Sequence, residues 1–209
     1  MSRTLYLFST TPHRDAVHVN SLDITFFTPK VNFGAYDYFI ITSKQSIEGL
    51  KNYPILTLLP ALCVSKKTAM AYEKIDGKIL DTGNGYGKSL IEKVAQYPKE
   101  KRWLYLRAEI VASDFISTCR DDGHDIDELV LYKSECSKNF SHVEIKQDAV
   151  LIFTSPSSVR CFLEHQVFYN EQKVVVIGRT TAQALPKDIV YSECEKSCID
   201  NCIEMALKL

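Results

Sequence analysis

The sequence of 209 residues lacks a strong excess of either charge, any long apolar run and any CxxC cysteine pair. Its net charge of −1 gives no electrostatic reason to expect a nucleic acid or an anionic membrane surface as a partner. The longest unbroken apolar run covers residues 149–153, whereas a helix that crosses a bilayer needs about 20 apolar residues. The first residues also lack a signal-peptide cleavage pattern. We therefore expect a cytoplasmic protein without a membrane segment.

Metal-binding patterns are absent as well, because the five histidines are scattered. Seven cysteines, an odd number, stand at positions 63, 119, 136, 161, 194, 198 and 202. In a cytosolic chain this favours free thiols over a disulfide framework. Cys194, Cys198 and Cys202 recur every fourth residue and would share one face of a helix. Since no histidine or fourth cysteine is near them, we interpret them as the buried stripe of a C-terminal helix rather than a metal or cluster site.

What the sequence does contain is an alternation of strand-like and helix-like segments. Strand-like apolar runs occur at residues 5–8, 38–41, 103–106, 149–153 and 174–177, and a helical period begins at Ser46. Near-continuous apolar runs are typical of strands that are buried on both faces of a parallel sheet. The fold class is therefore α/β, with room for one core or for two of roughly 100 residues each.

The chain also repeats itself. Residues 39–47 match 151–159, residues 64–69 match 177–182, and residues 5–7 match 104–106, in the same order along the chain. Three ordered matches indicate two copies of one α/β unit. By itself the repeat predicts two sequential halves.

In both copies a buried strand ends in Thr-Ser, at Thr42-Ser43 and Thr154-Ser155, and a helix follows at once. Two interpretations remain open. The hydroxyls could simply cap the helices, since Ser and Thr are preferred N-caps. Alternatively, hydroxyls, free backbone N–H groups and the helix dipole could bind a carboxylate or phosphate, because such loops are where open α/β sheets bind ligands.

These segments resemble the uroporphyrinogen-III synthase family. The resemblance is carried by short islands at residues 153–159 (FTSPSSV), 177–182 (IGRTTA), 129–132 (LVLY) and 104–107 (LYLR), with weaker ones at 41–43 and 64–69. The islands span almost the whole chain in the order the family has. Departures concern individual contacts: Ser65 stands where the second copy has Gly178, Ala108 replaces a frequent glycine, residues 9–12 lack a frequent arginine, and the chain is shorter than most members.

The resemblance implies two flavodoxin-like, three-layer α/β domains with parallel sheets, joined by a two-stranded antiparallel linker, with a cleft between the domains. Residues 1–31 and 135–209 would form one discontinuous domain, and residues 35–131 would form the inserted domain. The linker strands would lie near 28–35 and 129–136. Donors from both copies of the Thr-Ser junction would then line the two walls of the cleft.

The resemblance also implies the activity of a cyclising hydro-lyase of haem biosynthesis. Its substrate would be hydroxymethylbilane, a linear tetrapyrrole with eight carboxylates and one hydroxymethyl group. Loss of water gives an azafulvene, attack on the terminal pyrrole gives a spiro intermediate, and fragmentation and recombination give uroporphyrinogen III with that pyrrole inverted. Because the substrate supplies the reactivity, the enzyme would act mainly by holding a folded conformer. The implied protein is a cofactor-free monomer that makes at most transient contact with the preceding enzyme, hydroxymethylbilane synthase.

One side chain is singled out for chemistry. The phenol of Tyr132 could donate a proton to the departing hydroxyl, or it could be a strand tyrosine that packs one face and leaves its hydroxyl in water. For the substrate carboxylates we expect hydroxyls at Thr42, Ser43, Thr68, Ser155, Ser157, Thr180 and Thr181, and charges at Lys67 and Arg107.

Two other function classes stay open. Residues 83–89 (GNGYGKS) resemble a phosphate loop, but Thr82 stands where a P-loop requires glycine, so we expect a turn that leads into a helix through Val94. The acid-rich segment 121–128 lacks the calcium-loop pattern and predicts a solvated turn before a strand. The alternatives are therefore a nucleotide-dependent enzyme that uses residues 83–89, and a non-catalytic two-lobed binding module for a polyanionic ligand, which would not need Tyr132.

Overall fold

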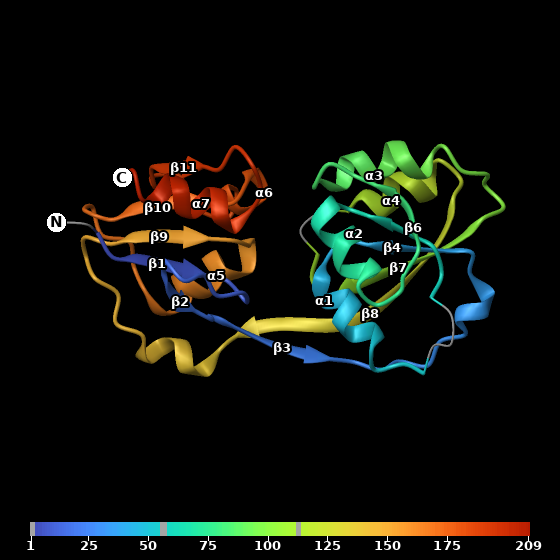
Figure 1. Cartoon of the computed structure of the whole chain (residues 1–209), viewed down its shortest axis with the longest axis horizontal. Coiled ribbons are helices and arrows are strands. Elements are labelled where there is room, and N and C mark those ends of the chain that lie inside the picture. The colour runs from blue at the N-terminus through green and yellow to red at the C-terminus, as the bar shows by residue number, and fades with distance from the viewer. Residues whose placement is uncertain (1–2, 55–57, 112–113) are drawn as a thin grey trace. The chain divides into compact units, whose positions relative to one another are not determined.

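The computed structural model describes residues 3–54, 58–111 and 114–209. By its internal contacts the chain divides into two compact units, which we call unit 1 (Met1–Ile24 with Ser134–Leu209) and unit 2 (Thr25–Lys133). Each unit is built on a sheet of mainly parallel strands with helices packed against it (Figure 1). The predicted α/β class with parallel sheets is confirmed.

In the described residues, the sheet of unit 1 has the strand order β11-β10-β9-β1-β2, and its strands pair in parallel. The strands are β1 Leu5–Phe8, β2 Val17–Val19, β9 Val150–Phe153, β10 Lys173–Val176 and β11 Tyr191–Glu193. The helices are α5 Pro156–His165, α6 Arg179–Ala182, α7 Ile199–Ala206 and the 3-10 helix η2 Lys138–His142. Counted along the chain, the strands follow the flavodoxin order 2-1-3-4-5.

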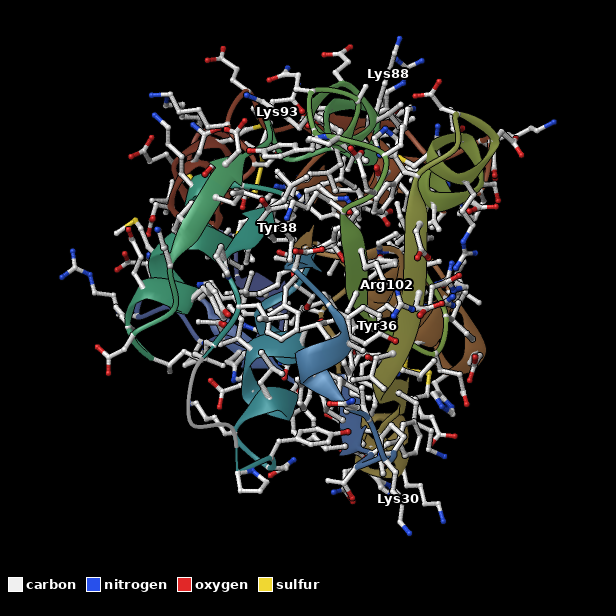
Figure 2. The ribbon with its side chains drawn as sticks, turned by 90° about the vertical axis from the view of Figure 1, so that its right-hand side faces the viewer. Lys30, Tyr36, Tyr38, Lys88, Lys93 and Arg102 are labelled. Atoms are coloured by element: carbon white, nitrogen blue, oxygen red, sulfur yellow. A yellow bond between two sulfur atoms is a disulfide. The ribbon has the colours of Figure 1, made fainter. Side chains whose placement is uncertain are left out.

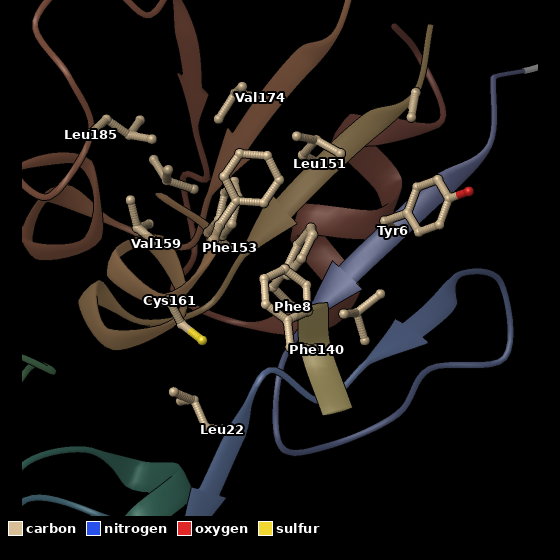
Figure 3. Packing of buried hydrophobic residues seen from close by; sticks show 14 of the residues in the cluster. Tyr6, Phe8, Leu22, Phe140, Leu151, Phe153, Val159, Cys161, Val174 and Leu185 are labelled. Carbon is tan, nitrogen blue, oxygen red and sulfur yellow. The ribbon is translucent and has the colours of Figure 1, made fainter. Parts of the chain in front are cut away.

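Both faces of this sheet are buried. Successive strand residues point to opposite faces, and in β1 and β9 both sets are apolar. Phe8 and Phe153 stack with ring centroids 4.6 Å apart and pack with Val159 of α5 (Figure 3). On the other face, Leu7 lies in a second cluster with Ile203 of α7. Full burial of each such side chain contributes about 1.5–3 kcal/mol, which explains why these strands are near-continuous apolar runs in the sequence.

The sheet of unit 2 has the order β3-β8-β7-β4-β5-β6 within the described ranges, and β4 to β8 pair in parallel. The strands are β3 Leu22–Phe26, β4 Tyr38–Ile41, β5 Ala61–Cys63, β6 Ile79–Thr82, β7 Arg102–Ala108 and β8 Asp125–Cys136. The helices are α1 Lys44–Leu50, α2 Lys66–Glu73, α3 Gly87–Val94, α4 Phe115–Asp121 and the 3-10 helix η1 Phe33–Ala35. Here β4 and β7 are neighbours, with β5 and β6 beyond β4 and β8 beyond β7.

Strands β3 and β8 are cut by the division into units, and they form an antiparallel pair. The Phe27 N–H donates to the Leu131 carbonyl (2.8 Å), and the Ser137 N–H donates to the Ser21 carbonyl (2.9 Å), so the partners run in opposite order. β8 extends over residues 125–136. β3 ends at Phe26, and the described residues 28–35 contain the 3-10 helix η1 but no strand. Pro29 lies in that segment, and proline has no N–H to donate to a ladder.

The repeated segments occupy equivalent places in the two sheets, but they do not divide the chain into sequential halves. In unit 1 the neighbours β1, β9 and β10 hold segments 5–7, 151–153 and 174–176. In unit 2 the neighbours β7, β4 and β5 hold the matching segments 104–106, 39–41 and 61–63. Each unit therefore combines strands of both sequence copies. β1 belongs to the first copy but pairs with β9 of the second, and β7 belongs to the second copy but pairs with β4 of the first.

The cysteine predictions are wrong in two respects. Among the described residues, disulfides join Cys136 to Cys161 and Cys194 to Cys202, with Cα atoms 5.3 and 5.6 Å apart, a separation that suits a disulfide. Cys63, Cys119 and Cys198 are the free thiols.

Nor do three cysteines share a helix face, because α7 begins at Ile199, with Cys198 as its N-cap. Cys194 directly follows β11. The four-residue spacing is therefore accidental: Cys194 follows a strand, Cys198 caps α7, and Cys202 lies within α7.

At the amino ends of β7 and β8, a charged network holds unit 2 together (Figure 2). The Arg102 guanidinium donates to Asp125 (2.9 Å) and Asp127 (3.2 Å) and lies 5.1 Å from the Tyr36 ring centroid. The Tyr36 hydroxyl donates to Asp127 at 2.8 Å. The acid-rich segment 121–128 is a turn only around Gly123, which has φ +88°. Asp121 still belongs to α4, and residues 125–128 already belong to β8, so the predicted turn is shorter than the segment. These groups have protein partners, whereas the opposite, carboxyl ends of the strands are where open α/β sheets bind ligands.

Candidate active site

The repeated Thr-Ser junctions stand at the topological switch point of each sheet. In unit 2 the chain leaves β4 first toward β5 and later returns to β7 on the other side. In unit 1 the same switch lies between β1 and β9. Ligands of open α/β sheets bind where the strand order reverses, outside the carboxyl ends. The structure therefore puts Thr42-Ser43 and Thr154-Ser155 where each sheet is best suited to bind a ligand.

The junction after β4 is fixed by several hydroxyls. Ser43 is the N-cap of α1 in extended backbone, and its Oγ accepts from the Gln45 N–H at 3.1 Å. The Thr42 Oγ1 and the Tyr105 hydroxyl of β7 lie 3.0 Å apart in a hydrogen bond. The Ser46 hydroxyl of α1 donates to the Leu106 carbonyl at 2.8 Å. Strand β7 thus holds the start of α1 through side-chain hydrogen bonds.

Tyr132 on β8 belongs to the same corner of unit 2. Only 6% of its surface is exposed, so its phenol is not in bulk water. Burial raises the pKa of the Tyr132 phenol above its ordinary value of 10.0, and a side-chain hydrogen bond with Ser43 partly lowers it again. The net shift is upward. Tyr132 is therefore a protonated phenol at neutral pH, poised beside a helix N-cap, and can donate a proton.

The neighbouring junction after β5 caps α2. Ser65, which the sequence analysis did not select, is the N-cap: its Oγ accepts from the Thr68 N–H at 3.3 Å and contacts the Thr68 Oγ1 at 3.1 Å. Thr68 is buried, so its hydroxyl supports the cap. Lys67 is exposed in the first turn of α2. The polar position at Ser65, aligned with Gly178 in the repeat, was the sequence signal for this cap.

Unit 1 repeats the arrangement after β9. The Thr154 hydroxyl donates to the Phe8 carbonyl of β1 at 2.9 Å, across the switch point. Ser155 is the N-cap of α5, with Pro156 in its first turn, and its Oγ accepts from the Ser158 N–H at 3.1 Å. Ser157 is half-buried in the same turn. This N-terminus keeps one hydroxyl, at Ser157, beside the open first-turn amides.

The junction after β10 has a glycine cap instead. Gly178 is the N-cap of α6, a short helix of four residues. Thr180 is half-buried, whereas Thr181 is only 3% exposed and its N–H donates to the Gly178 carbonyl. Of this predicted pair, Thr180 is thus the side chain with access to a ligand.

Arg107 has protein partners already. Its guanidinium pairs with Glu128 and donates to the carbonyls of Ala108 (2.9 Å) and Glu109 (2.8 Å). Arg120 of α4 pairs with the same Glu128 at 2.9 Å. Any role of Arg107 toward a substrate would require it to leave this network.

Residues 83–86 form a turn after β6, and α3 begins at Gly87 and runs through Val94, where the sequence predicted the helix to end. The Ser89 hydroxyl accepts from the Asn84 N–H (3.1 Å) and donates to the Tyr86 carbonyl (2.8 Å). A Cβ on Gly83 would lie 2.6 Å from the Ser89 Oγ and 2.9 Å from the Val64 carbonyl. The hydroxyl that a P-loop would offer to a metal ion is therefore buried and internally bonded.

One group of potential metal ligands was missed by the sequence analysis. Cys136, Cys161 and His165 offer ligand atoms within 4.8 Å of one another. The two sulfurs are joined in a disulfide, and disulfide sulfur is not the thiolate that binds zinc. Cys161 and His165 are four residues apart on α5, which was the available sequence signal.

Comparisons with known proteins agree on one family. The family model described as uroporphyrinogen-III synthase HemD matches residues 13–197. The solved uroporphyrinogen-III synthetase from Helicobacter pylori superposes with a TM-score of 0.81 at 23% identity, covering 99% of both chains. A mutant uroporphyrinogen III synthase from Thermus thermophilus gives a TM-score of 0.59 at 14% identity, covering 98% of this chain and 97% of that one. No curated protein matches the sequence. Among the described helices, none is long and apolar enough to cross a membrane.

Proposed function

The chain belongs to the uroporphyrinogen-III synthase HemD family, and we propose that it performs the family's reaction with the Tyr132 phenol as proton donor and the strand–helix junctions as carboxylate sites. The enzyme is a cyclising lyase of tetrapyrrole biosynthesis that converts hydroxymethylbilane to uroporphyrinogen III. The proposal concerns which residues do this work and how.

A buried, protonated phenol beside the Ser43 cap carries the assignment of Tyr132. The hydroxymethyl C–O bond breaks as the Tyr132 O–H transfers its proton to the leaving oxygen, so that water departs and an azafulvenium cation and a phenolate remain. The substituted carbon of the terminal pyrrole attacks the azafulvenium carbon to give the spiro intermediate. Fragmentation and recombination close the ring, and the proton lost from the last ring carbon restores the phenol. Each turnover thus balances as one substrate to one product plus one water.

The junctions supply donors for the substrate carboxylates. Backbone N–H groups in the first turn of a helix and the positive end of its dipole favour an anion. Holding several carboxylates at once would select the folded conformer whose ends can meet. The residues in this role are Thr42, Ser43, Lys67, Ser155, Ser157 and Thr180. The buried Thr68 and Thr181 would support the helix starts beside them, and Arg107 would add a charge if it exchanges Glu128 for a carboxylate.

The deciding experiment supplies hydroxymethylbilane and measures the isomer formed. Spontaneous closure gives the type I ring, whereas the enzyme gives type III. We expect type III product from the wild-type protein. Type I product alone would contradict the assignment and favour the alternative of a non-catalytic module that binds a polyanion. Nucleotide binding without type III product would favour an enzyme that uses residues 83–89.

We further propose a cytoplasmic monomer with two domains, 1–31 with 135–209 and 35–131, that contacts hydroxymethylbilane synthase only transiently. The small-molecule substrate needs no second subunit, and the net charge of −1 gives no overall attraction to nucleic acid. Light scattering would test the monomer, and cross-linking during turnover would test the contact.

A further inference from the structure

We propose that Tyr105 is a positioning residue for Tyr132: its hydroxyl holds Thr42 and thereby fixes Ser43 against the Tyr132 phenol. This inference rests on the proposed role of Tyr132. Tyr105 itself is buried and need not touch the substrate.

The hydroxyl of Tyr105 connects two elements at the switch point of unit 2. It lies 3.0 Å from the Thr42 Oγ1 at the end of β4. The ring is held in place by an edge contact with Phe115, with centroids 5.2 Å apart, within the cluster between the sheet and α3 and α4. Only 3% of Tyr105 is exposed. Such a buried phenol offers Thr42 a partner that cannot easily move.

Thr42 and Ser43 are consecutive, so an anchor on Thr42 limits where the Ser43 hydroxyl can lie. Ser43 is extended at φ −145° and ψ 146° and caps α1 through Gln45. The same Ser43 hydroxyl interacts with Tyr132 and lowers the pKa of that phenol. The chain Tyr105–Thr42–Ser43–Tyr132 thus joins β7, β4, α1 and β8.

Several neighbouring groups influence the pKa values of the Tyr105 and Tyr132 phenols. Burial raises the pKa of Tyr105 above its ordinary value, the Thr42 hydrogen bond and Arg107 lower it in part, and Tyr132 and Glu128 raise it. Tyr132 faces Ser43, with Phe26 beside its ring at 6.3 Å. Loss of the Tyr105 hydroxyl would free Thr42 and weaken the Ser43 contact. The pKa of Tyr132 should then rise, because the interaction that lowers it is lost.

Tyr105→Phe tests this directly, since it removes one oxygen and keeps the ring. We expect kcat to fall about 5- to 10-fold, the effect of losing one net hydrogen bond. KM should rise by a smaller factor, because Thr42 and Ser43 are only two of the proposed carboxylate donors. The alkaline limb of kcat should move to higher pH. The ¹³Cζ resonance of Tyr132, assigned with Tyr132→Phe, should titrate at higher pH in the variant.

Tyr72→Phe is the matched control. Tyr72 is also fully buried in unit 2, and its hydroxyl donates to the Leu59 carbonyl at 2.8 Å. Its loss should cost similar stability without moving the Tyr132 titration. Thr42→Val removes the same hydrogen bond from the other side, so the double variant with Tyr105→Phe should shift the Tyr132 resonance no further than either single change.

Wild-type kcat and an unshifted Tyr132 titration in Tyr105→Phe would overturn the inference. A fall in kcat without a change in the Tyr132 titration would also overturn the inference, because it would indicate general destabilisation of the protein. If Tyr132→Phe itself leaves turnover unchanged, the proposed role of Tyr132 fails. The resonance shift would still decide whether Tyr105 positions that phenol.

Discussion

At the scale of single residues, Tyr132 owes its character to two opposed influences. Burial disfavours the phenolate, and the Ser43 hydroxyl favours it, with burial dominant. A phenol whose pKa is raised remains a donor throughout the neutral range but is a weaker acid than a free tyrosine. This suits a reaction in which a reactive substrate needs only a positioned proton.

Tyr132→Phe should therefore lower type III formation about 100-fold, the lower end of the range for general acid catalysis. Thermal unfolding should change little, because the ring stays buried. The measurement is the initial rate of type III product, with the melting temperature as control. Unchanged turnover would remove Tyr132 from the mechanism.

The pH dependence of the wild type follows from the same shift. Because the proposed proton donor is the acid form, and the pKa of Tyr132 is raised from 10.0, kcat should show no loss from deprotonation of Tyr132 between pH 7 and about 10. A limb that appears near neutral pH and disappears in Tyr132→Phe would contradict the raised pKa.

At the scale of elements, the strand–helix junctions cap helices, and we propose that they also bind anions. The capping is shown by hydrogen bonds: the Oγ atoms of Ser43, Ser65 and Ser155 each accept from a backbone N–H in the first turn of the helix. Capping and anion binding use different amides of the same turn, because the first four N–H groups of a helix lack partners within it. The two interpretations can therefore hold together, and a substitution can separate them.

Ser155→Ala and Ser155→Asp form such a pair. Alanine removes the cap and should cost about 1 kcal/mol of unfolding free energy, whereas aspartate is a good cap and should cost little. The added carboxylate would repel a substrate carboxylate, so Ser155→Asp should raise KM about tenfold or more. Denaturant unfolding and steady-state kinetics measure the two effects. Wild-type KM in Ser155→Asp would show that Ser155 only caps.

At the scale of the whole chain, the fold determines which cysteines form disulfides and which remain free thiols. The structure joins Cys136 to Cys161 and Cys194 to Cys202. Alkylation of the denatured, unreduced protein should therefore label the three cysteines at 63, 119 and 198, and all seven after reduction. Closing the loop between Cys136 and Cys161 should add about 3 kcal/mol of stability by the chain-entropy argument. Seven labelled cysteines before reduction would contradict the pairing.

Unit 2 is continuous in sequence, and this makes it the separable part. Its core of Ile40, Trp103, Tyr105 and Ile126 lies wholly within the unit. We expect a fragment of residues 25–133 to unfold cooperatively in a calorimeter, because it keeps one complete hydrophobic core. A fragment of residues 134–209 lacks β1 and should not, since β1 is central in its sheet. A non-cooperative melt of the first fragment would contradict two separate domains.

The sequence by itself determined the α/β class, the central strands and the Thr-Ser junctions, because burial on both faces and helix capping leave local patterns in the chain. It also carried the family resemblance that the family match confirms. It predicted two sequential halves from the repeat, free thiols and a cysteine stripe, all of which the structure corrected.

Only the tertiary structure decided how the strands of the two copies are combined, which cysteines meet, and that Tyr105 reaches Thr42 at the switch point. These features join residues far apart in the chain. A local pattern of hydrophobicity specifies that a strand is buried, but not which strand lies beside it. Sheet order and side-chain contacts therefore follow from the packing of the whole unit.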